Sequence, residues 1–339
     1  MAGTRFAYVR NFELPDPCIP STYLIVRIDG KGFHKFSTLH SFLKPNDPVA
    51  LELMNESARH VMRSLKGHIS LAFGESDEYS FLLRKSTTLY NRRISKITTH
   101  IVSLFTSAYV WNWARYFPGK RLEQPPSFDG RLVVYPSERV VRDYFSWRQA
   151  DTHINSLYNT TFWALVLKGE RTEQEATKEL ERTVSADKHE ILYQRFGINY
   201  DQLEPMFRKG TTLIYTPAST TTSQQGIEEE GEEEEEEKGE KGVLSNPKDE
   251  KTRLRIELKK GAREAKSQEK KEKKAKASVL RTLHCDLIGD DFWNPAPISA
   301  LAMEEETIPT AEGEGGIGEP WNNPARFNGA GMGVSVFLA

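Results

Sequence analysis

Cysteine is scarce in this chain: 339 residues contain only Cys18 and Cys285, separated by most of the sequence. Neither belongs to a Cys-x-x-Cys pair or to a Cys/His spacing, which excludes a disulfide scaffold and argues against a structural zinc site. Long apolar runs are also missing, so we expect no transmembrane helix and no membrane partner. Residues 1–17 carry charges and prolines where a signal peptide needs an apolar segment. Together these absences predict an intracellular protein of the cytoplasm or the nucleus.

Net charge is nearly balanced at −2, but the charges are unevenly distributed. Residues 228–240 hold ten Glu and one Lys, which contribute −9, so the rest of the chain carries +7. A basic remainder of this kind is typical of proteins that bind polyanions such as nucleic acid, although it does not require such a partner.

Residues 217–277 differ in composition from the rest of the chain. They are first rich in Ser and Thr, then in Glu, and finally in Lys, with few apolar residues. Such blocks of like charge bury too little apolar surface to offset their chain entropy, so we predict a disordered acidic and basic insertion. The Lys-rich half is interpreted as a solvated linker in preference to an RNA contact.

Apolar spacing in the first half of the chain predicts strands alternating with helices. Tyr23–Ile28 lacks strict alternation and is rich in β-formers, which indicates a central strand. Asp47 and Pro48 supply the N-cap and first position of an amphipathic helix. Residues 68–83 then predict a strand, a tight turn at Gly74 and a second strand.

Further helices follow the hairpin. One is expected over about 91–116, with Arg92 and Lys96 on its polar face. Another should begin after Ser137 as N-cap, although the polar residues 152–160 ought to interrupt it. The predicted class is α+β, with an antiparallel or mixed sheet, helices packed on one side and the disordered insertion.

Acidic side chains lie at the tips of two predicted strands. Asp29 ends the first strand, and Asp77 and Glu78 open the last strand of the hairpin. If the hairpin pairs with the first strand, these carboxylates converge at one edge of the sheet. Carboxylate oxygens are ligands for Mg²⁺, and two ions roughly 3.5–4 Å apart stabilise the attacking and leaving oxygens of phosphoryl transfer.

The residues after Asp29 suit a phosphate. Gly30 and Gly32 let the backbone approach a triphosphate closely, and Lys31, His34 and Lys35 add positive charge. From the residues alone, two interpretations stay open. One is metal-dependent phosphoryl transfer, and the other is a polar β-turn beside a surface hairpin.

Six segments, in order along the chain, resemble the tRNA-histidine guanylyltransferase family. They are RIDGKGFHKF (27–36), KPND (44–47), GESDEYSF (74–81), DGRLVVYPS (129–137), WRQADTHINSLYNT (147–160) and GINY with FRKGT (within 197–211). The resemblance runs through residues 1–215 and resumes at LHCDLIGDDFW (283–293), leaving out the charged insertion and the tail. Six ordered motifs make a chance match improbable.

The resemblance implies a reaction. Members of the family add a guanosine to the 5′ end of histidine tRNA, growing the chain in the 3′–5′ direction. The 5′-monophosphate is activated with ATP, the 3′-hydroxyl of GTP attacks the activated end, and pyrophosphate is then removed. GTP and ATP as substrates, two Mg²⁺ ions per active site and a homotetramer built as a dimer of dimers are implied as well.

The same resemblance implies a division into regions. Residues 1–136 would form a catalytic domain similar to the palm of ordinary polymerases. Residues 137–216 would form a helical tRNA-recognition region with a returning strand. After the insertion at 217–277, residues 278–339 would form a short ordered segment and a flexible tail.

Site residues are implied at the positions that match the motifs. Asp29, Asp77 and Glu78 would be catalytic. Asp29, Asp77 and the Gly30 carbonyl would bind the metal ions. The expected nucleotide-binding residues are Asp29, Gly30, Lys31, Gly32, Phe33, His34, Lys44, Asn46, Ser76, Asp77, Arg92 and Lys96. The expected tRNA-binding residues are His153, Asn155, Lys188, Asn199, Arg208 and Lys209, since His and Asn side chains suit the exposed edges of unpaired anticodon bases. The family string is commonly HINNLYNT, and Ser156 replaces its fourth residue, which weakens the prediction of anticodon selectivity.

The same fold also suits other functions. A template-dependent 3′–5′ tRNA repair polymerase is the nearest alternative, and the anticodon-type segment at 147–160 favours the histidine-specific enzyme over it. A nucleotide cyclase has no evident use for that segment. A palm-fold RNA-binding protein without activity is disfavoured, because clustered carboxylates beside a polyanion are unfavourable unless metals neutralise them.

Overall fold

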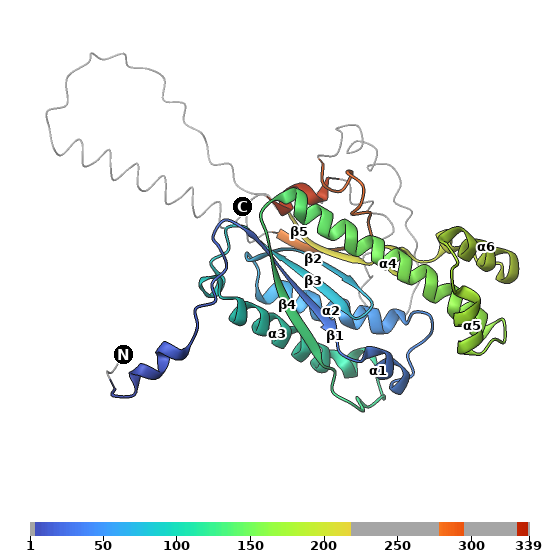
Figure 1. Ribbon diagram of the computed structural model, residues 1–339, viewed down its shortest axis with the longest axis horizontal. Coiled ribbons are helices and arrows are strands. Elements are labelled where there is room, and N and C mark those ends of the chain that lie inside the picture. Colours follow the sequence, from blue (N-terminus) through green and yellow to red (C-terminus); the bar gives the residue numbers. More distant parts are fainter. Residues whose placement is uncertain (1–3, 218–277, 295–330, 338–339) are drawn as a thin grey trace, which may run out of the picture. The chain divides into compact units, whose positions relative to one another are not determined.

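A six-stranded sheet organises the protein, for which the computed structural model describes residues 4–217, 278–294 and 331–337 (Figure 1). The strands are β1 (Tyr23–Gly30), β2 (Ile69–Glu75), β3 (Glu78–Leu83), β4 (Phe128–Tyr135), β5 (Thr211–Pro217) and β6 (Ser278–Leu283). Their order is β4-β1-β3-β2-β5-β6. β1 pairs with β3 and β4, and β2 with β3 and β5, all antiparallel. The predicted α+β class and antiparallel sheet are confirmed. The insertion predicted at 217–277 lies, after Pro217, outside the described residues.

The helices are placed largely where their capping residues indicated. They are η1 (Ala7–Phe12), α1 (Phe33–Leu39), α2 (Pro48–Ser64), η2 (Leu89–Arg92), α3 (Ile94–Tyr116), α4 (Glu138–Leu167), α5 (Glu173–Leu180), α6 (Ser185–Phe196), η3 (Tyr200–Gln202), α7 (Pro205–Lys209) and η6 (Met332–Val336). The Asp47 carboxylate accepts from the backbone N–H groups of Val49 and Ala50, which caps α2. Ser137 caps α4 by accepting from Val140 N–H. Within the described ranges, none of these helices is long and apolar enough to cross a membrane.

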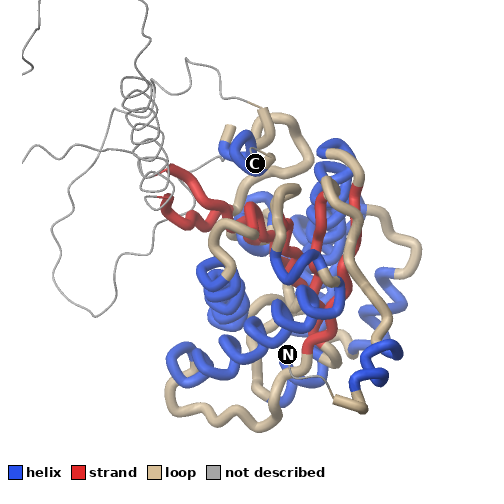
Figure 2. Tube along the Cα trace, turned by 90° about the vertical axis from the view of Figure 1, so that its left-hand side faces the viewer, coloured by secondary structure: helices blue, strands red, loops and turns tan. Residues whose placement is uncertain are grey.

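Helices cover both faces of the sheet, which corrects the expectation that they pack on one side (Figure 2). Leu24 and Val26 of β1 are buried in one apolar cluster with α2 and α3. Ile25 is buried in a second cluster with α4 and the C-terminal segments. The physical reason is already present in β1, because a strand that is apolar on both faces needs cover on both.

The β2–β3 turn is formed by Ser76 and Asp77, and not by Gly74 as expected. Gly74 lies inside β2, where a Cβ atom would come within 2.1 Å of the Tyr79 ring. Glycine is therefore required there by a packing contact. Ser76 takes the positive φ of the turn, at 47°.

Arg92 does not lie on the polar face of a helix over 91–116, so that expectation is corrected. It belongs to η2, before α3 begins, and is only 8% exposed. Its guanidinium donates to the carbonyls of Lys85 and Thr87 and to those of Ile19 and Thr22. Arg92 thus ties the segment before β1 to the segment before α3, whereas Lys96 lies exposed on α3 as predicted.

α4 is one continuous helix of 30 residues, so the interruption expected at 152–160 is wrong. Thr152 and Thr161 donate their hydroxyls to the carbonyls four residues earlier, which leaves the helical hydrogen bonds in place. Tertiary packing overrides the weak local propensity: the first half of α4 lies on the sheet, and the second half continues past it toward α5 and α6 (Figure 1).

The chain returns to α4 after the insertion. Gln149 is buried, and its side-chain amide donates to the backbone carbonyls of Lys209 and Cys285 at 2.8 and 2.9 Å. Its side-chain oxygen accepts from Leu287 N–H at 2.6 Å. A single side chain therefore holds the end of α7 and the segment after β6 against α4.

Candidate active site

The predicted acidic edge is formed where β1 and β3 pair. Asp29 stands opposite Glu78 in the register, and Gly30 N–H donates to the Asp77 carbonyl at 3.1 Å. The hairpin therefore lies beside the first strand, as the sequence predicted. In the part of the chain that the structure describes, no group of three or more His, Cys, Asp and Glu side chains forms a metal cluster. The candidate site is a pair of carboxylates, Asp29 and Asp77, with backbone oxygens beside them.

Asp77 and Glu78 are neighbours in sequence with opposite surroundings. Burial, followed by the like charge of Asp29, raises the pKa of Asp77 to about 6. Glu78 instead has counter-ions: Arg148 Nη1 is 3.3 Å from both carboxylate oxygens, and Arg27 Nε is 3.8 Å away. Two carboxylates that repel each other in a buried setting favour a cation between them. Asp29 and Asp77 therefore fit a divalent metal. Burial raises the pKa of Glu78 as well, but the charges of Arg148 and Arg27 oppose that rise.

Arg148 is a residue of this edge that sequence reasoning missed. It is 5% exposed, and it contacts Glu75 at 3.7 Å and Asp151 at 3.3 Å in addition to Glu78. Its guanidinium lies over the Trp147 ring, 3.6 Å from the centroid. Burial is the main cause that raises the pKa of Glu75 to about 7. Through Arg148, α4 is fixed to the strand ends that carry the acidic residues.

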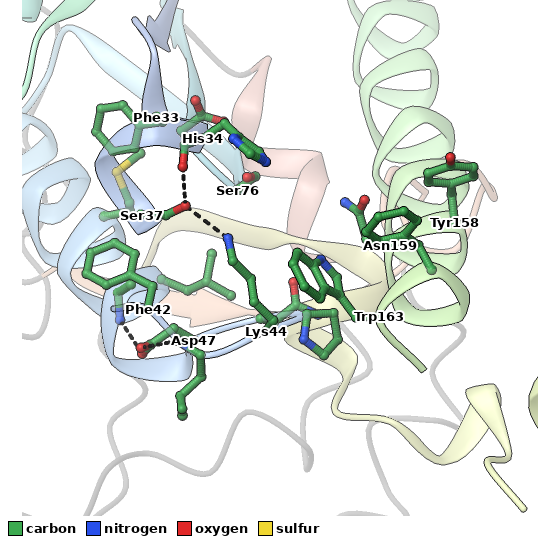
Figure 3. A pocket seen from close by; sticks show the side chains of 18 of the residues that line it. Phe33, His34, Ser37, Phe42, Lys44, Asp47, Ser76, Tyr158, Asn159 and Trp163 are labelled. Atoms are coloured by element: carbon green, nitrogen blue, oxygen red, sulfur yellow. Dashed lines mark hydrogen bonds between the residues drawn. The ribbon is translucent and has the colours of Figure 1, made fainter. Parts of the chain in front are cut away.

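A cavity of about 530 Å³ opens beside Asp77 (Figure 3). One wall comes from α1 and the loop before α2, and the opposite wall comes from the second half of α4. Of the predicted nucleotide-binding residues, those that line it are Phe33, His34, Lys44, Asn46, Ser76 and Asp77. Its lining also includes several aromatic rings, among them Phe42, Tyr109 and Trp163. Aromatic walls together with the carboxylate of Asp77 and the ammonium of Lys44 suit a nucleotide.

Lys44 is oriented within this cavity, which we call the first cavity. Its Nζ donates to Ser37 Oγ at 3.0 Å, and Ser37 Oγ donates to the His34 carbonyl at 2.9 Å (Figure 3). Lys44 Nζ also lies 5.5 Å from the centre of the Trp163 ring. The loop that carries it is fixed by Leu43 N–H, which donates to the Asp47 carboxylate at 3.0 Å.

Comparison with known proteins identifies the family. The family model for "tRNAHis guanylyltransferase" matches residues 6–136, and that for the "Thg1 C terminal domain" matches residues 139–289. The chain belongs to the tRNA(His) guanylyltransferase family. It is therefore an enzyme, a nucleotidyltransferase.

Relatives across much of the chain agree. The tRNA(His) guanylyltransferase of Schizosaccharomyces pombe is 44% identical over 304 residues, which cover 90% of this chain and 100% of that protein. The probable human tRNA(His) guanylyltransferase is 43% identical over 303 residues, covering 88% of each.

Solved structures match as well. The crystal structure of the Saccharomyces cerevisiae tRNA(His) guanylyltransferase has 51% identity and a TM-score of 0.60, covering 62% of this chain and 93% of that one. A bacterial tRNA(His) guanylyltransferase-like protein in complex with ATP is 23% identical, with a TM-score of 0.51, covering 62% of this chain and 84% of that one, and shows that the fold is shared.

Other expected nucleotide-binding residues of this family member do not line the first cavity. Gly32 caps α1 with a φ of 71°, and Gly30 packs under Phe33, whose ring would be 2.3 Å from an added Cβ. Asp29 lies near the end of β1 and Lys31 in the turn that follows it, while Arg92 and Lys96 lie elsewhere. Their nucleotide contacts stay predictions.

The expected tRNA-binding residues gather mainly where α4 meets α6, η3 and α7. The Tyr200 ring lies 5.4 Å from that of His153 and 5.3 Å from that of His189, between centroids. Burial, followed by the charge of His189, lowers the pKa of His153. Lys188, adjacent to His189, donates to the Thr183 carbonyl at 2.9 Å.

Three further tRNA candidates make local contacts. The Asn199 side chain accepts from Asp201 N–H at 3.0 Å, and Arg208 Nε donates to the Leu203 carbonyl at 2.9 Å. The Lys209 carbonyl is held by Gln149. tRNA binding by these residues stays a prediction.

Asn155 lies apart from that group. It lines a smaller cavity of about 90 Å³ together with Glu75, Ser76 and Asn159, and thus faces the acidic edge. Sequence reasoning missed most of the α4 wall of the first cavity, which consists of Tyr158, Asn159, Phe162 and Trp163. The sequence does contain a signal for it: Arg148, Thr152, Asn155, Asn159 and Trp163 are spaced by four, three, four and four residues. Such a spacing places side chains on one side of a helix, but only if the helix is continuous.

Proposed function

We propose that this enzyme adds a guanosine to the 5′ end of histidine tRNA. The 5′-phosphate is activated with ATP, and the 3′-hydroxyl of GTP attacks the activated end. Family membership supports the reaction class. The observation that carries the proposal is the repelling carboxylate pair of Asp29 and Asp77, of which Asp77 lines a cavity of nucleotide size together with Lys44.

The carboxylate pair would hold the metal ions of this reaction. Asp29, Asp77 and the Gly30 carbonyl would bind two Mg²⁺, since the two carboxylates repel each other and gain a counter-charge from a cation. When bound, the ions neutralise phosphate charge and stabilise the attacking and leaving oxygens. Glu78, held by Arg148, would support the site without serving as a principal ligand.

The first cavity would hold the incoming nucleotide. Its phosphates would lie toward Ser76, Asp77 and Lys44, where hydroxyl and ammonium donors meet the acidic edge. Its base would lie among the aromatic rings, because every base has a face that stacks on such rings. Enclosure between α1 and α4 would restrict water at the reacting phosphate.

The α4–α6–η3 surface would read the anticodon. His153, Lys188 and Asn199 belong to segments that meet around Tyr200. Unpaired bases present edges and stacking faces to side chains of this kind. The homotetramer implied by the resemblance is part of the proposal, and sedimentation equilibrium measures it.

A transfer assay tests the proposal. The full chain is incubated with Mg²⁺, ATP, labelled GTP and 5′-monophosphorylated histidine tRNA, and in parallel with phenylalanine tRNA. Asp77→Ala removes one member of the carboxylate pair, while Asp143→Ala removes an exposed carboxylate of α4 and serves as the matched control. We expect label at the 5′ end of histidine tRNA alone, lost in Asp77→Ala and kept in Asp143→Ala.

Each other result has a distinct meaning. Label on both tRNAs would favour the template-dependent repair enzyme. Activity retained in Asp77→Ala would contradict the metal assignment. Absence of label on either tRNA, with RNA still bound, would favour a binding protein without activity.

A further inference from the structure

The loop that joins α3 to β4, residues 118–127, is anchored on α1, the helix that follows the acidic edge. Lys31 N–H donates to the Ser127 carbonyl at 2.8 Å, and Glu123 N–H donates to His40 Nε2 at 3.0 Å. Lys31 lies just before α1 and His40 just after it, so the loop runs alongside the whole helix (Figure 1).

Four cationic side chains are exposed on these two segments. Lys31 and Lys35 belong to the turn before α1 and to α1 itself, and Lys120 and Arg121 belong to the loop. We call these four residues the basic patch. Within the residues that the structure describes, none of the four forms an ion pair. Exposed cations without a counter-ion repel one another and attract a polyanion.

The loop end of the basic patch has a fixed position. The carbonyl of Lys120 accepts from Trp113 Nε1 at 2.9 Å, and Trp113 is only 4% exposed. The Trp113 ring in turn lies 4.8 Å from that of His40, between centroids. Lys120 and Arg121 are therefore held against the end of α1 by a buried residue of α3.

The basic patch is separate from the place proposed for the incoming nucleotide. None of its residues lines the first cavity or the smaller cavity beside it. On α1, His34 and Ser37 line the first cavity, whereas Lys35 does not. Exposed cations on an open surface suit a row of phosphates along a chain, while a small ligand needs a concave site.

The basic patch begins at the acidic edge. Lys31 follows Asp29 by two residues, and Gly30 pairs with Phe128, the residue directly after the loop. From there the patch extends away from the edge along α1. An RNA with its 5′-phosphate at Asp29 has further phosphates, and these must pass over a surface next to the edge.

We propose that the basic patch binds the phosphate backbone of the tRNA acceptor stem, next to the 5′ end that reacts. This inference rests on the proposed function, in which the RNA 5′ end reaches the acidic edge while GTP occupies the first cavity. Phosphate contacts fix the position of an RNA without reading its sequence. The basic patch therefore strengthens the binding of all tRNAs alike and leaves selection among them to other surfaces.

Three double variants separate charge from structure. Lys120→Ala/Arg121→Ala removes two charges of the basic patch and keeps the backbone carbonyl that Trp113 holds. Lys120→Arg/Arg121→Lys keeps both charges. Arg139→Ala/Lys178→Ala removes the same charge from exposed positions of α4 and α5 and is the matched control.

Fluorescence anisotropy of the full chain measures the effect, with a labelled 5′-monophosphorylated RNA hairpin that copies the acceptor stem and has no anticodon. The titration is repeated at salt concentrations between about 50 and 200 mM. Lys120→Ala/Arg121→Ala should weaken binding at low salt at least about tenfold and reduce the slope of log affinity against log salt by about 2. The other two variants should bind like wild type. Labelled GTP should bind all four proteins equally, which also shows that the variants are folded.

Histidine tRNA and phenylalanine tRNA are titrated in the same way, and Lys120→Ala/Arg121→Ala should weaken both by the same factor. Unchanged affinity and salt slope in this variant would overturn the inference, while guanosine addition by wild type would keep the proposed function. Weaker binding with an unchanged slope would overturn it too, because a lost phosphate contact lowers the slope. So would an effect on the tRNAs that is absent with the hairpin. Absence of guanosine addition by wild type would instead overturn the proposed function, and this inference with it.

Discussion

The two faces of the sheet are built differently. The face under α2 and α3 is mainly apolar, with Val26, Phe81 and Phe105 fully buried in one large cluster. The face under α4 is apolar only toward one end, where Phe145 is buried. Toward the acidic edge it becomes polar: Ser80 and Tyr144 share a hydrogen bond of 2.7 Å, and Arg148 meets Glu78.

This difference between the two faces indicates that one contributes mainly to stability and the other mainly to the chemistry of the site. Burying apolar side chains stabilises the fold directly, whereas a buried ion pair contributes little net stability because both charges lose their hydration. The α2–α3 face therefore stabilises the fold, whereas the α4 face has less apolar contact and instead orients charged side chains. α4 also forms a wall of the first cavity, so its packing and the site depend on each other.

The largest effect is expected at the edge where the faces meet. Asp77→Asn should lower guanosine addition at least about a thousandfold, because it removes a charge that we propose binds a metal ion. The free energy of unfolding should stay the same or rise, since the repulsion between Asp77 and Asp29 disappears. Transfer kinetics and urea unfolding measure the two effects. A loss of stability matching the loss of activity would contradict the separation.

Substitutions at two phenylalanines allow the two faces to be compared directly. Phe105 and Phe145 are both fully buried, one on each face. Phe105→Ala and Phe145→Ala should each lower the free energy of unfolding by about 3–5 kcal/mol through the cavity they leave. Only Phe145→Ala should also lower turnover per folded molecule, because Phe145 anchors the helix that carries Arg148. Equal turnover in both variants would show that α4 does not need this anchor.

Arg148 probes the charged part of the α4 face. Arg148→Ala leaves Glu75 and Glu78 buried without this counter-ion, so we expect a loss of about 3 kcal/mol of unfolding free energy. The exposed pair of Arg139 with Asp143 is the control, and Arg139→Ala should cost less than about 1 kcal/mol. Urea unfolding at constant pH compares them. Equal losses of unfolding free energy in Arg148→Ala and Arg139→Ala would mean that the Arg148 network is solvated.

His153 tests the middle of α4, where the helix meets Tyr200. His153→Ala should reduce the preference for histidine tRNA over phenylalanine tRNA about tenfold, equivalent to 1.4 kcal/mol. GTP binding should not change, because His153 does not line the first cavity. The ratio of kcat/KM for the two tRNAs measures the effect. A parallel loss for both tRNAs would indicate a structural role in the Tyr200 cluster.

The smallest effect concerns His284, which contacts the start of β5 at Gly210 and Thr211. Burial lowers the pKa of His284, and its Nδ1 lies 2.8 Å from the Gly210 carbonyl. The unfolded chain therefore binds a proton at His284 more readily than the folded chain does. The stability contributed by neutral His284 is complete above about pH 6.5 and is lost as the pH falls below it. Wild type should lose more stability than His284→Phe between pH 7 and 5, by less than about 1.4 kcal/mol per pH unit. An equal loss of unfolding free energy with falling pH in wild type and His284→Phe would contradict this role of His284.

Local signals in the sequence were reliable where one residue decides a local structure. Asp47 and Ser137 cap the helices that they were expected to cap. The acidic residues at the ends of β1 and β3 lie at one edge because pairing of adjacent strands brings their tips together. These features depend on near neighbours along the chain or across one strand pair.

Local signals misled where distant packing decides. Gly74 was assigned to a turn, but it makes room for Tyr79. Arg92 was assigned to a helix face, but its guanidinium holds two loops together. The polar stretch in α4 was expected to break the helix, yet contacts with the sheet and with α6 keep it continuous.

The sequence by itself determined the class, the family and the acidic residues, because motif chemistry and capping are encoded within a few positions. Only the tertiary structure decided which of those residues face one another. The contrast between Asp77 and Glu78 arises from Arg148, about 70 residues away along the chain. The walls of the first cavity are built from α1, the loop before α2 and the second half of α4, which no local pattern connects. Burial and charge pairing depend on spatial neighbours, and only the folded chain supplies them.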